Sequence, residues 1–369
     1  MFESLMNSIK QSTKSFFSVT LMNWLGTDLS KRDMPWKKTN DPYHIWISEI
    51  ILQQTQVKQG LDYYLKFVKL FPDVSSLANA QEEEVLSCWK GLGYYSRARN
   101  LHATAKYIVD DLNGVFPSTY QELLKLKGVG PYSAAAISSF AFDEAKAVVD
   151  GNVYRLLGRF FAIEEDIQSS RGKKIYQDLA DQLIDTSRPG KYNQAIMDFG
   201  ALICKPALPL CDQCPLNKKC SSLKTNTVLN YPIKTKKIKR KKRFFHFIAI
   251  NKNDQWVMKC RQDKDIWRGL YQFPAFETQQ SKQASQDQLL DKLSEVLSDV
   301  SERNLTIYLN SKNKQLLTHQ EINAHFYVLE LDADSKLNPD YQWIEKNELN
   351  KIAIPKIIDD YIKAIILQS

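Results

Sequence analysis

Several features that define other classes of protein are missing from this sequence of 369 residues. It has no run of about 18 apolar residues, so no transmembrane helix is expected. Polar residues interrupt its N-terminal segment throughout, and without an apolar core that segment does not resemble a secretory signal. We therefore expect a cytoplasmic protein that does not bind membranes. Its length exceeds that of most single domains and predicts two or more.

The sequence has only five histidines, and none lies near its cluster of cysteines. Four of the six cysteines share the spacing C-x6-C-x2-C-x5-C, at Cys204, Cys211, Cys214 and Cys220. A zinc finger needs nearby histidines, and a zinc ribbon needs a second C-x2-C pair. Four thiolates in one short loop of a cytoplasmic chain are instead typical of an iron–sulfur cluster. Zinc is the alternative, and four unrelated cysteines are the third interpretation.

The net charge of the chain is +8. This balance favours a polyanionic partner such as nucleic acid without proving one. The segment KTKKIKRKKR at 234–243 concentrates basic residues. Such a run is usually solvated and extended, so residues 226–243 are predicted to link two domains. Contact with phosphate groups is the other interpretation, and both can hold.

Apolar residues are arranged differently on the two sides of this linker. In residues 1–225 they recur at helical spacing between short turns with glycine or proline, which predicts an all-α domain. Residues 244–369 begin with a β-rich pattern, in which KNDQ at 252–255 is expected to form a hairpin turn. A helix is expected near 286–300 and a closing helix at 354–368. The second domain is therefore predicted to be α/β or α+β.

Two short motifs lie in the helical part. In LKGVGPYSAAAI, residues 126–137, Gly128 and Gly130 allow a tight turn whose backbone N–H groups can meet a phosphate. The second motif, VVDGNVYR, follows at 148–155. A glycine pair alone is a weak signal. The order of the G-V-G turn, the Asp-Gly-Asn-Val segment and the four spaced cysteines, however, resembles the endonuclease III family of helix-hairpin-helix DNA glycosylases.

Within that family the sequence is similar to the MutY-type adenine DNA glycosylases. RDMPWKK, DPYHIWISEIILQQTQV, GLGYYSRARNL, DGNVYR and NQAIMDFGALIC match that branch in order. The resemblance implies an all-α helix-hairpin-helix core with a [4Fe-4S] cluster on the four cysteines, followed by a Nudix-like α+β domain. It also implies a monomer that acts on double-stranded DNA with adenine opposite 8-oxoguanine or guanine. The glutamate-rich Nudix box is missing after Gly269, so the second domain is expected to recognise a lesion and not to hydrolyse phosphates.

The resemblance assigns Glu49 as the general acid that protonates adenine. It assigns Asp150 as the carboxylate that stabilises the positively charged sugar. Breaking an N-glycosidic bond benefits from both, as in glycoside hydrolases with two carboxyl groups. A protonated acid near neutral pH needs a partly buried setting, which Ile47 and Ile50 could give Glu49. The alternatives are a solvated glutamate on a helix face and an aspartate that caps a turn.

Further site residues follow from the same resemblance. Tyr132 stands where bifunctional relatives carry a Schiff-base lysine, so we expect a glycosylase without lyase activity. Asn152 would support the catalytic centre. The pocket for the extruded adenine is expected to include Arg32, Met34, Trp36 and Gln194. The competing explanations are helix-start packing for Tyr132, a turn for Asn152 and core packing for Met34 and Trp36.

A third group of residues is expected to touch the DNA. Tyr94 resembles an aromatic wedge that enters the duplex, although GLGYY could also form a core-packed turn. The other expected contacts are Leu52, Gln54, Gly128, Gly130, Thr318 and His319. Leu317-Thr318-His319 corresponds to the Phe-Ser-His loop with which the family reads 8-oxoguanine, and Leu317 departs from the aromatic residue there.

The helix that carries Glu49 changes character along its length. At about 100° per residue, one apolar stripe holds Trp46, Ile47, Ile50 and Ile51. Glu49 falls on the roughly opposite face, toward a predicted cleft. Gln54 would lie on the apolar stripe if the helix continued, so we expect the helix to end near Gln53.

Two other functions are compatible with parts of the sequence. One is a bifunctional glycosylase/lyase that acts on oxidised pyrimidines, and Tyr132 and the added C-terminal domain argue against it. The other is a non-catalytic DNA-binding protein, and the presence of both Glu49 and Asp150 argues against that.

Overall fold

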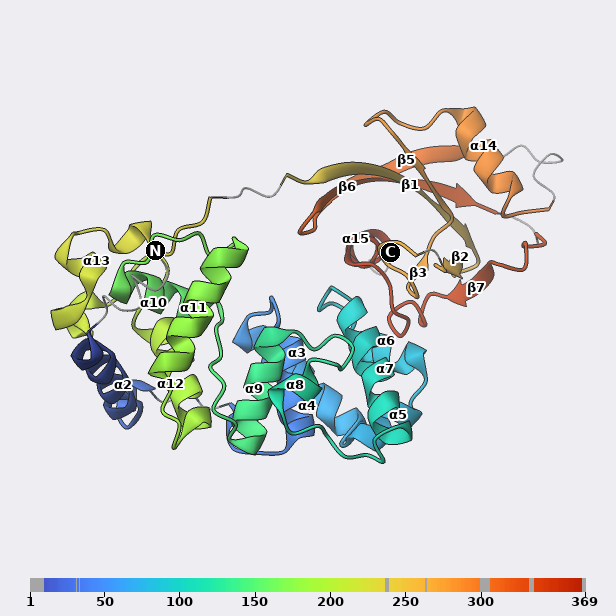
Figure 1. Ribbon diagram of the computed structural model, residues 1–369. Helices are drawn as coiled ribbons and strands as arrows, with labels where there is room; N and C mark the ends of the chain where they lie inside the picture. Colours follow the sequence, from blue (N-terminus) through green and yellow to red (C-terminus); the bar gives the residue numbers. More distant parts are fainter. Residues whose placement is uncertain are drawn as a thin grey trace. The chain divides into compact units, whose positions relative to one another are not determined.

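The computed structural model describes residues 10–30, 32, 34–235, 239–262, 264–298, 306–331 and 335–366 (Figure 1). The chain forms two compact units. The first consists of Met1–Asn79 and Asn100–Lys236, and the second of Ala80–Arg99 and Lys237–Ser369. Among the described residues, no helix has both the length and the apolar character needed to cross a membrane.

The first unit is built from helices, which confirms the prediction for this part of the chain. The helices are α2 (Gln11–Leu25), α3 (Pro42–Leu52), α4 (Val57–Leu70), α5 (Val74–Asn79), α7 (Ser96–Asp110), α8 (Tyr120–Leu123), α9 (Pro131–Phe142), α10 (Gly151–Phe161), α11 (Ser170–Leu183), α12 (Pro189–Leu202) and α13 (Ser221–Lys224). Single 3-10 turns are η1 (Asp28–Ser30), η2 (Pro35–Lys37), η3 (Cys211–Gln213), η4 (Asn217–Lys219) and η5 (Val228–Asn230). The first residues of α7 belong to the second unit.

Local signals set where the helices begin and end. Asp41 caps α3, because its carboxylate accepts a hydrogen bond from the backbone N–H of Tyr43 at 2.8 Å. α9 begins at Pro131, where the missing N–H of proline costs a helix nothing. α3 ends at Leu52, which confirms the predicted end near Gln53. α3 packs against α9, and this pairing brings their side chains together.

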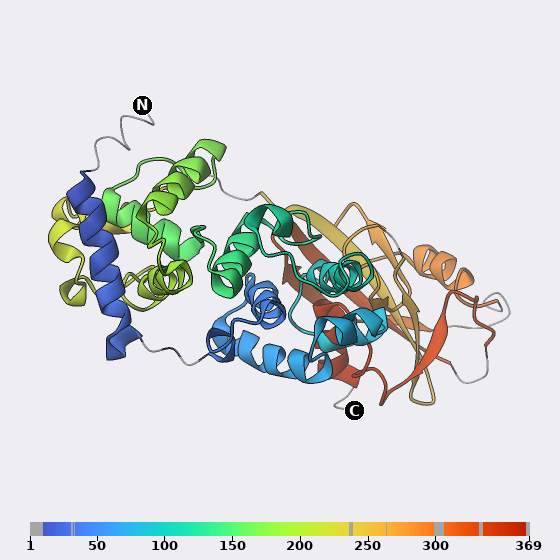
Figure 2. The same ribbon diagram turned by 60° about the horizontal axis from the view of Figure 1, so that its bottom comes forward.

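Aromatic side chains fill the core of the first unit around α2, which lies beside α12 (Figure 2). The aromatic side chains that are almost fully buried in this core are Phe17, Phe160, Tyr176, Tyr192 and Phe199. The ring centroids of Phe17 and Phe160 are 4.9 Å apart. Each such ring contributes about 1.5–3 kcal/mol by leaving water. Because Phe160 belongs to α10, this core fixes the helix at whose start Asp150 lies.

The second unit contains a seven-stranded sheet. Its strands are β1 (Lys241–Lys252), β2 (Gln255–Cys260), β3 (Tyr271–Gln272), β4 (Ala275–Thr278), β5 (Ile307–Leu316), β6 (Gln320–Glu330) and β7 (Gln342–Glu345). The strand order is β3-β2-β1-β6-β5, with β4 paired to β1 and β7 paired to β2. β1 and β6 run parallel, and the other pairs are antiparallel. The helices of this unit are α6 (Glu82–Cys88), α14 (Gln286–Ser294), α15 (Lys356–Tyr361) and the π-helical turn η7 (Ile362–Ile366).

Alternate residues of β1 serve two cores, one on each face of the sheet. Phe245 and Phe247 belong to the core that includes Ile358 of α15. Ile248 and Ile250 belong to the core that includes α14. Figure 1 shows these two helices on opposite faces of the sheet. Because both faces are covered, β1 is apolar from Phe244 to Ile250 except at His246, and the predicted α+β architecture is confirmed.

The structure refines the predicted boundaries. Asn253 and Asp254 have φ of 48° and 63°, and they form the expected two-residue turn between β1 and β2. β1 begins at Lys241, inside the predicted linker, because β6 pairs with it from Gln320 onward. Residues 236–238 of that linker lie outside the described part of the chain. No change in composition marks residues 80–99, which pack in the second unit.

Candidate active site

Three side chains from three helices meet at the candidate active site. Glu49 lies in α3, Tyr132 in the first turn of α9, and Asp150 at the residue that caps α10. A hydrogen bond joins the Tyr132 hydroxyl to the Glu49 carboxyl group, and Asp150 is close enough for its charge to act on both. The fold therefore brings together three predicted residues that are far apart in the sequence.

Burial changes the acidity of Glu49. Its side chain is only 6% exposed, and α3 is buried on nearly every side from Ile45 to Ile51. Loss of hydration raises the pKa of Glu49 from its usual 4.5 to about 7. The hydrogen bond with Tyr132 lowers this pKa, and the negative charge of Asp150 raises it. Glu49 can therefore hold a proton near neutral pH, and it is not a solvated surface glutamate.

Asp150 is held in one orientation by the helix that it caps. Its Oδ1 accepts hydrogen bonds from the backbone N–H groups of Asn152 and Val153, both at 2.8 Å. Its Oδ2 accepts one from Asn152 Nδ2 at 2.7 Å, and Arg155 Nη2 in turn donates to Asn152 Oδ1 at 2.8 Å. Burial raises the pKa of Asp150, while these hydrogen bonds lower it. Asp150 is thus both a helix cap and a member of the site.

A cavity of about 260 Å³ adjoins Glu49. Trp36 and Gln194, two residues predicted to hold adenine, line it. Met34 is buried and Arg32 is partly exposed, and neither is among the lining residues of the cavity. Sequence reasoning did not anticipate the other lining residues, which are Lys37, Thr39, Ile45, Ser48, Phe140, Asp143, Gly190 and Lys191.

Asp198, which was not predicted, binds two residues that line this cavity, Lys37 and Gln194. Its carboxylate is buried and accepts hydrogen bonds from Arg32 Nη1 at 3.0 Å and Lys37 Nζ at 2.5 Å. Gln194 Nε2 donates to it at 3.3 Å. A buried carboxylate is stable only with such partners. The spacing could have revealed it, because Asp198 follows Gln194 by one turn of α12 and so shares its face.

The turn before α9 has the geometry of a tight hairpin. Gly128 has φ of +83°, and a Cβ at this position would lie 2.7 Å from Cβ of Asn100. A Cβ at Gly130 would meet nothing within 4 Å. The protein therefore leaves space in front of the first turn of α9, where backbone N–H groups can bind a phosphate.

The loop after α3 lies beside this helix start. Gln53 Nε2 donates a hydrogen bond to Ser133 Oγ at 3.1 Å. Gln54 is exposed and has φ of 58°, a left-handed conformation that stops the helix, while Leu52 is partly buried. The predicted contacts Leu52 and Gln54 thus lie near the hairpin in the same unit.

Three other predicted DNA contacts line one cavity of the second unit. This cavity of about 510 Å³ is bordered by Tyr94, Thr318 and His319. Tyr94 is 44% exposed, and its hydroxyl lies 2.5 Å from Oγ1 of Thr318. Leu317, which stands in place of an aromatic residue, packs against the core of the sheet. Trp267 also lines the cavity and had not been predicted.

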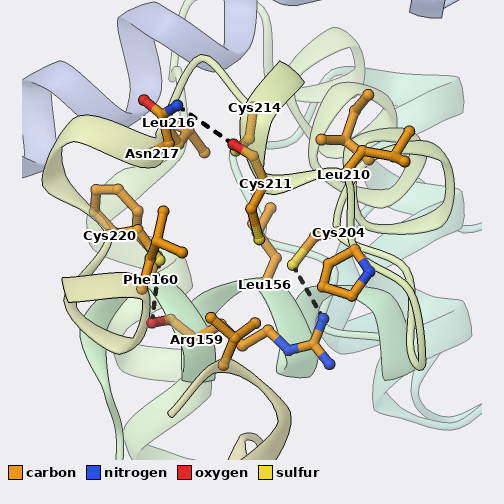
Figure 3. Close-up of a pocket in the computed structure, with 14 residues that line it drawn as sticks. Leu156, Arg159, Phe160, Cys204, Leu210, Cys211, Cys214, Leu216, Asn217 and Cys220 are labelled. Atoms are coloured by element: carbon orange, nitrogen blue, oxygen red, sulfur yellow. Dashed lines mark hydrogen bonds between the residues drawn. The ribbon is translucent and has the colours of Figure 1, made fainter. Parts of the chain in front are cut away.

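The four clustered cysteines line a single cavity, shown in Figure 3. Its apolar walls include Leu156, Phe160, Leu210 and Leu216. Arg159 reaches the cavity from α10, with Nη1 at 3.5 Å from Cys204 Sγ, and it donates to the carbonyls of Lys205 and Pro206 at 2.7 Å each. Among the described residues, no three His, Cys, Asp or Glu side chains converge on a position for a single metal ion.

Comparisons with known proteins identify both parts of the chain. The family model for HhH-GPD superfamily base excision DNA repair proteins matches residues 47–182, and that for NUDIX domains matches residues 245–364. An adenine DNA glycosylase of Buchnera aphidicola subsp. Baizongia pistaciae is 36% identical over 307 residues, which cover 81% of this chain and 86% of that protein. The adenine DNA glycosylase of Rattus norvegicus is 46% identical over 213 residues, or 55% of this chain and 41% of that protein. A solved thermostable thymine-DNA glycosylase aligns with a TM-score of 0.54 at 30% identity, over 58% of this chain and 98% of that one.

The helical core and the hairpin thus define a base excision repair protein of the HhH-GPD superfamily, a DNA N-glycosylase with a Nudix-like second domain. Within this superfamily, the chain belongs to the adenine DNA glycosylase family.

The two glycines of the hairpin should respond differently to alanine. Gly128→Ala should lower the free energy of unfolding by about 1–3 kcal/mol, because alanine is strained at positive φ and its Cβ would contact Asn100. Gly130→Ala should change stability by less than about 0.5 kcal/mol. It should nevertheless weaken binding to duplex DNA, since it fills the space in front of α9. Chemical denaturation and DNA-binding titrations measure the two effects. Equal destabilisation by both substitutions would contradict this account of the turn.

The pKa of Glu49 predicts a pH-dependent gain in stability when its charge is removed. Below pH 4.5 the carboxyl group is protonated in the folded and unfolded chain, so burial costs little. Above pH 7 the buried group must ionise, and this lowers the free energy of unfolding by about 3 kcal/mol. Glu49→Gln should therefore raise the free energy of unfolding at pH 8 by up to that amount and have little effect near pH 4.5.

Chemical denaturation of the wild type and of Glu49→Gln at both pH values measures this difference. The matched control is Glu164→Gln, because Glu164 lies in the same unit and is exposed. A gain that does not depend on pH, or one that Glu164→Gln reproduces, would rule out a raised pKa at Glu49.

Proposed function

We propose that this protein is a monofunctional adenine DNA glycosylase. It would remove adenine opposite 8-oxoguanine or guanine in double-stranded DNA and leave an abasic site. The observation that carries the proposal is the pairing of a buried, proton-holding Glu49 with an oriented Asp150 beside a cavity. Because the proposed substrate is DNA, we place the action of the protein in the cytoplasm, with the DNA.

The two carboxyl groups have different tasks in the proposed reaction. Adenine is a poor leaving group as an anion, so Glu49 protonates the base as the N-glycosidic bond breaks. The sugar becomes positively charged, and the carboxylate of Asp150 stabilises it. Hydrogen bonds from Asn152 and Val153 hold that carboxylate in place and favour its ionised form. Water then completes the hydrolysis and yields the abasic site.

The cavity beside Glu49 supports base flipping. An adenine inside a duplex is out of reach of a buried carboxyl group, so it must be extruded first. Trp36 offers an aromatic surface, and Gln194 offers an amide that can pair with the edge of a base. Asp198 holds the Gln194 amide and the Lys37 ammonium at fixed positions.

A lyase reaction is the alternative, and it requires an amine that attacks the sugar. Tyr132 provides a hydroxyl instead, and burial together with the charge of Glu49 raises its pKa well above the usual 10.0. It therefore remains protonated and is a poor nucleophile. Two lysines line the cavity: Lys37, whose ammonium group is bound to Asp198, and Lys191, which is exposed. These features favour hydrolysis over strand cleavage.

The second unit is proposed to read the base opposite adenine. Tyr94 is exposed at the cavity that Thr318 and His319 line, so an aromatic ring and a hydroxyl group are available together. An aromatic ring can stack on a base in an opened duplex, and the hydroxyl of Thr318 can donate to or accept from a base edge. Leu317 packs against the core of the sheet although it also lines the cavity, so the polar groups that this loop offers a base come from Thr318 and His319.

We also propose that the cysteine cavity holds a [4Fe-4S] cluster. Its donor set fits, because Cys204, Cys211, Cys214 and Cys220 surround an apolar space and thiolates are the preferred ligands of such clusters. Arg159 donates toward Cys204 Sγ, which would offset the negative charge of the ligated sulfurs. When bound, the cluster would tie Cys204, just after α12, to Cys220, just before α13.

An excision assay tests the proposed activity. Duplexes with A:8-oxoguanine, with A:G or with an oxidised pyrimidine are incubated with the protein and then treated with or without alkali. Adenine release should occur on the first two duplexes, and strand breaks should need alkali. Glu49→Gln and Asp150→Asn should each lower the excision rate by about 100-fold or more while DNA binding persists.

Lack of adenine release would refute the proposed function, and strand breaks without alkali would refute the monofunctional mechanism. Glu348→Gln serves as a control in the same assay, because this glutamate is exposed in the second unit. Full activity in Glu49→Gln or in Asp150→Asn would remove that residue from the mechanism.

Metal analysis tests the cluster independently of activity. The purified protein should be brown and contain roughly four iron and four sulfide ions per chain. Cys204→Ser should lose most of the iron, whereas Cys260→Ser should keep it, because Cys260 belongs to β2 and lies outside the cavity. A colourless protein with bound zinc would contradict the proposal.

A further inference from the structure

The segment that carries Tyr94 is fastened to the second unit by its side chains. Residues 80–99 pack with the C-terminal part of the chain. Four of their side chains donate hydrogen bonds to backbone carbonyls of that part: Ser87 to Lys351 at 2.5 Å, Lys90 to Leu349 and Asn350 at 3.0 and 3.2 Å, Tyr95 to Ile354 at 3.2 Å, and Arg99 to Arg268 at 2.5 Å. Hydrogen bonds to main-chain carbonyls fix the backbone position of the loops that they join.

Lys90 has more of these partners than the other three side chains. Besides its two carbonyl acceptors, its Nζ lies 3.3 Å from Oδ1 of Asp359 in α15. The side chains of Lys90 and Asp359 are only 14% and 10% exposed. Burial lowers the pKa of Lys90, and Asp359 raises it. A buried ammonium group is costly unless it is paired, so removal of either partner should loosen this junction.

The chain reverses directly after Lys90. The turn contains three residues with positive φ: Gly91 at 94°, Gly93 at 74° and Tyr94 at 49°. A tyrosine rarely adopts this conformation and does so only when its surroundings enforce it. The Arg97 guanidinium supports the far side of the turn, at 5.1 Å from the Trp89 ring and 5.9 Å from the Tyr94 ring. Lys90 is therefore the anchor at the start of a strained turn that ends with Tyr94.

We propose that Lys90 is a positioning residue for recognition of the base opposite adenine. By tying the start of the turn to residues 349–350 and to Asp359, it sets the distance between Tyr94 and Thr318 across their shared cavity. This inference rests on the proposed function, because it assumes that the cavity reads the opposite base. Lys90 does not line the cavity and acts through Tyr94.

The geometry gives this role a physical basis. The Tyr94 hydroxyl and Thr318 Oγ1 are 2.5 Å apart, so a small shift of the turn breaks their contact and widens the cavity. Recognition that depends on a stacked ring and a neighbouring hydroxyl group is lost when the two move apart by about 1 Å. Glu49 and Asp150 belong to the other unit, so the chemical step should be largely unaffected.

Single-turnover kinetics on A:8-oxoguanine and A:G duplexes test the proposal. The excision rate is measured against protein concentration, which separates the half-saturating concentration from the maximal rate. For Lys90→Met, the half-saturating concentration on A:8-oxoguanine should rise about fivefold to tenfold. It should rise about twofold or less on A:G, and the maximal rates should stay within about twofold of the wild type. Lys90→Arg, which keeps the charge and the donors, should restore most of the preference for 8-oxoguanine.

Lys363→Met is the matched control. Lys363 Nζ also binds Asp359, at 2.6 Å from Oδ2, but its side chain is 58% exposed. Like Lys90→Met, the Lys363→Met substitution removes one positive charge and one partner of Asp359. Any uniform loss of attraction to DNA therefore appears in both variants. The preference of Lys363→Met for A:8-oxoguanine over A:G should equal that of the wild type.

The outcomes distinguish this inference from the proposed function. If the wild type releases no adenine, or releases it equally from both duplexes, the proposed function itself fails. If the wild type prefers A:8-oxoguanine and Lys90→Met keeps that preference, the role of Lys90 is refuted. A parallel fall of the maximal rate on both duplexes also refutes it. If Lys90→Met does not fold, Asp359→Asn is measured instead, because it leaves both carbonyl acceptors of Lys90 in place. Asp359→Asn should show a smaller loss of the preference for A:8-oxoguanine over A:G. An unchanged preference would refute the proposal.

Discussion

The burial of one carboxyl group, that of Glu49, is the constraint on which the site depends. A glutamate ionises well below neutral pH in water, and only the removal of water lets it hold a proton near pH 7. Two helices and a helix cap are needed to achieve this: α3 carries the group, α9 covers it with Tyr132, and Asp150 at the start of α10 adds a negative charge. The aromatic core around Phe160 and Phe199 holds α10 and α12 firmly enough to maintain that arrangement.

Asp150 combines the role of a helix cap with a place in the candidate site. As the cap of α10 it satisfies two backbone N–H groups that would otherwise lack partners, a contribution of about 1 kcal/mol. The same hydrogen bonds hold its carboxylate in a fixed orientation next to Glu49, where two carboxyl groups repel each other if both are charged. The repulsion is avoided when Glu49 is protonated and Asp150 is ionised. The hydrogen bonds at Asp150 favour its ionised form, although burial raises the pKa of both carboxyl groups.

Local patterns in the sequence were sufficient to predict the structure where one short segment determines it. The end of α3 near Gln53, the Asn253-Asp254 turn and the hairpin at Gly128 each follow from a few neighbouring residues, and the structure has all three. Contacts between distant segments could not be read in this way. The spacing of Asp198 from Gln194 indicates only that they share a helix face, whereas the ion pairs of Asp198 with Arg32 and Lys37 are visible only in the structure. No local pattern links residues 80–99 to the C-terminal part of the chain. The burial of every residue of α3 from Ile45 to Ile51 also exceeds what a single apolar stripe indicates, because α9 covers a second face.

The assignment of residues 80–99 to the second unit means that the chain passes between the two units three times, at residues 79–80, 99–100 and 236–237. The segment is joined by peptide bonds to α5 on one side and runs into α7 on the other, and both helices belong mainly to the first unit. Because Lys90 pairs with Asp359 and with two carbonyls in a setting of low exposure, that junction resists displacement of the turn. A turn with three positive φ angles can adopt few other conformations, so it moves as a unit with its anchor.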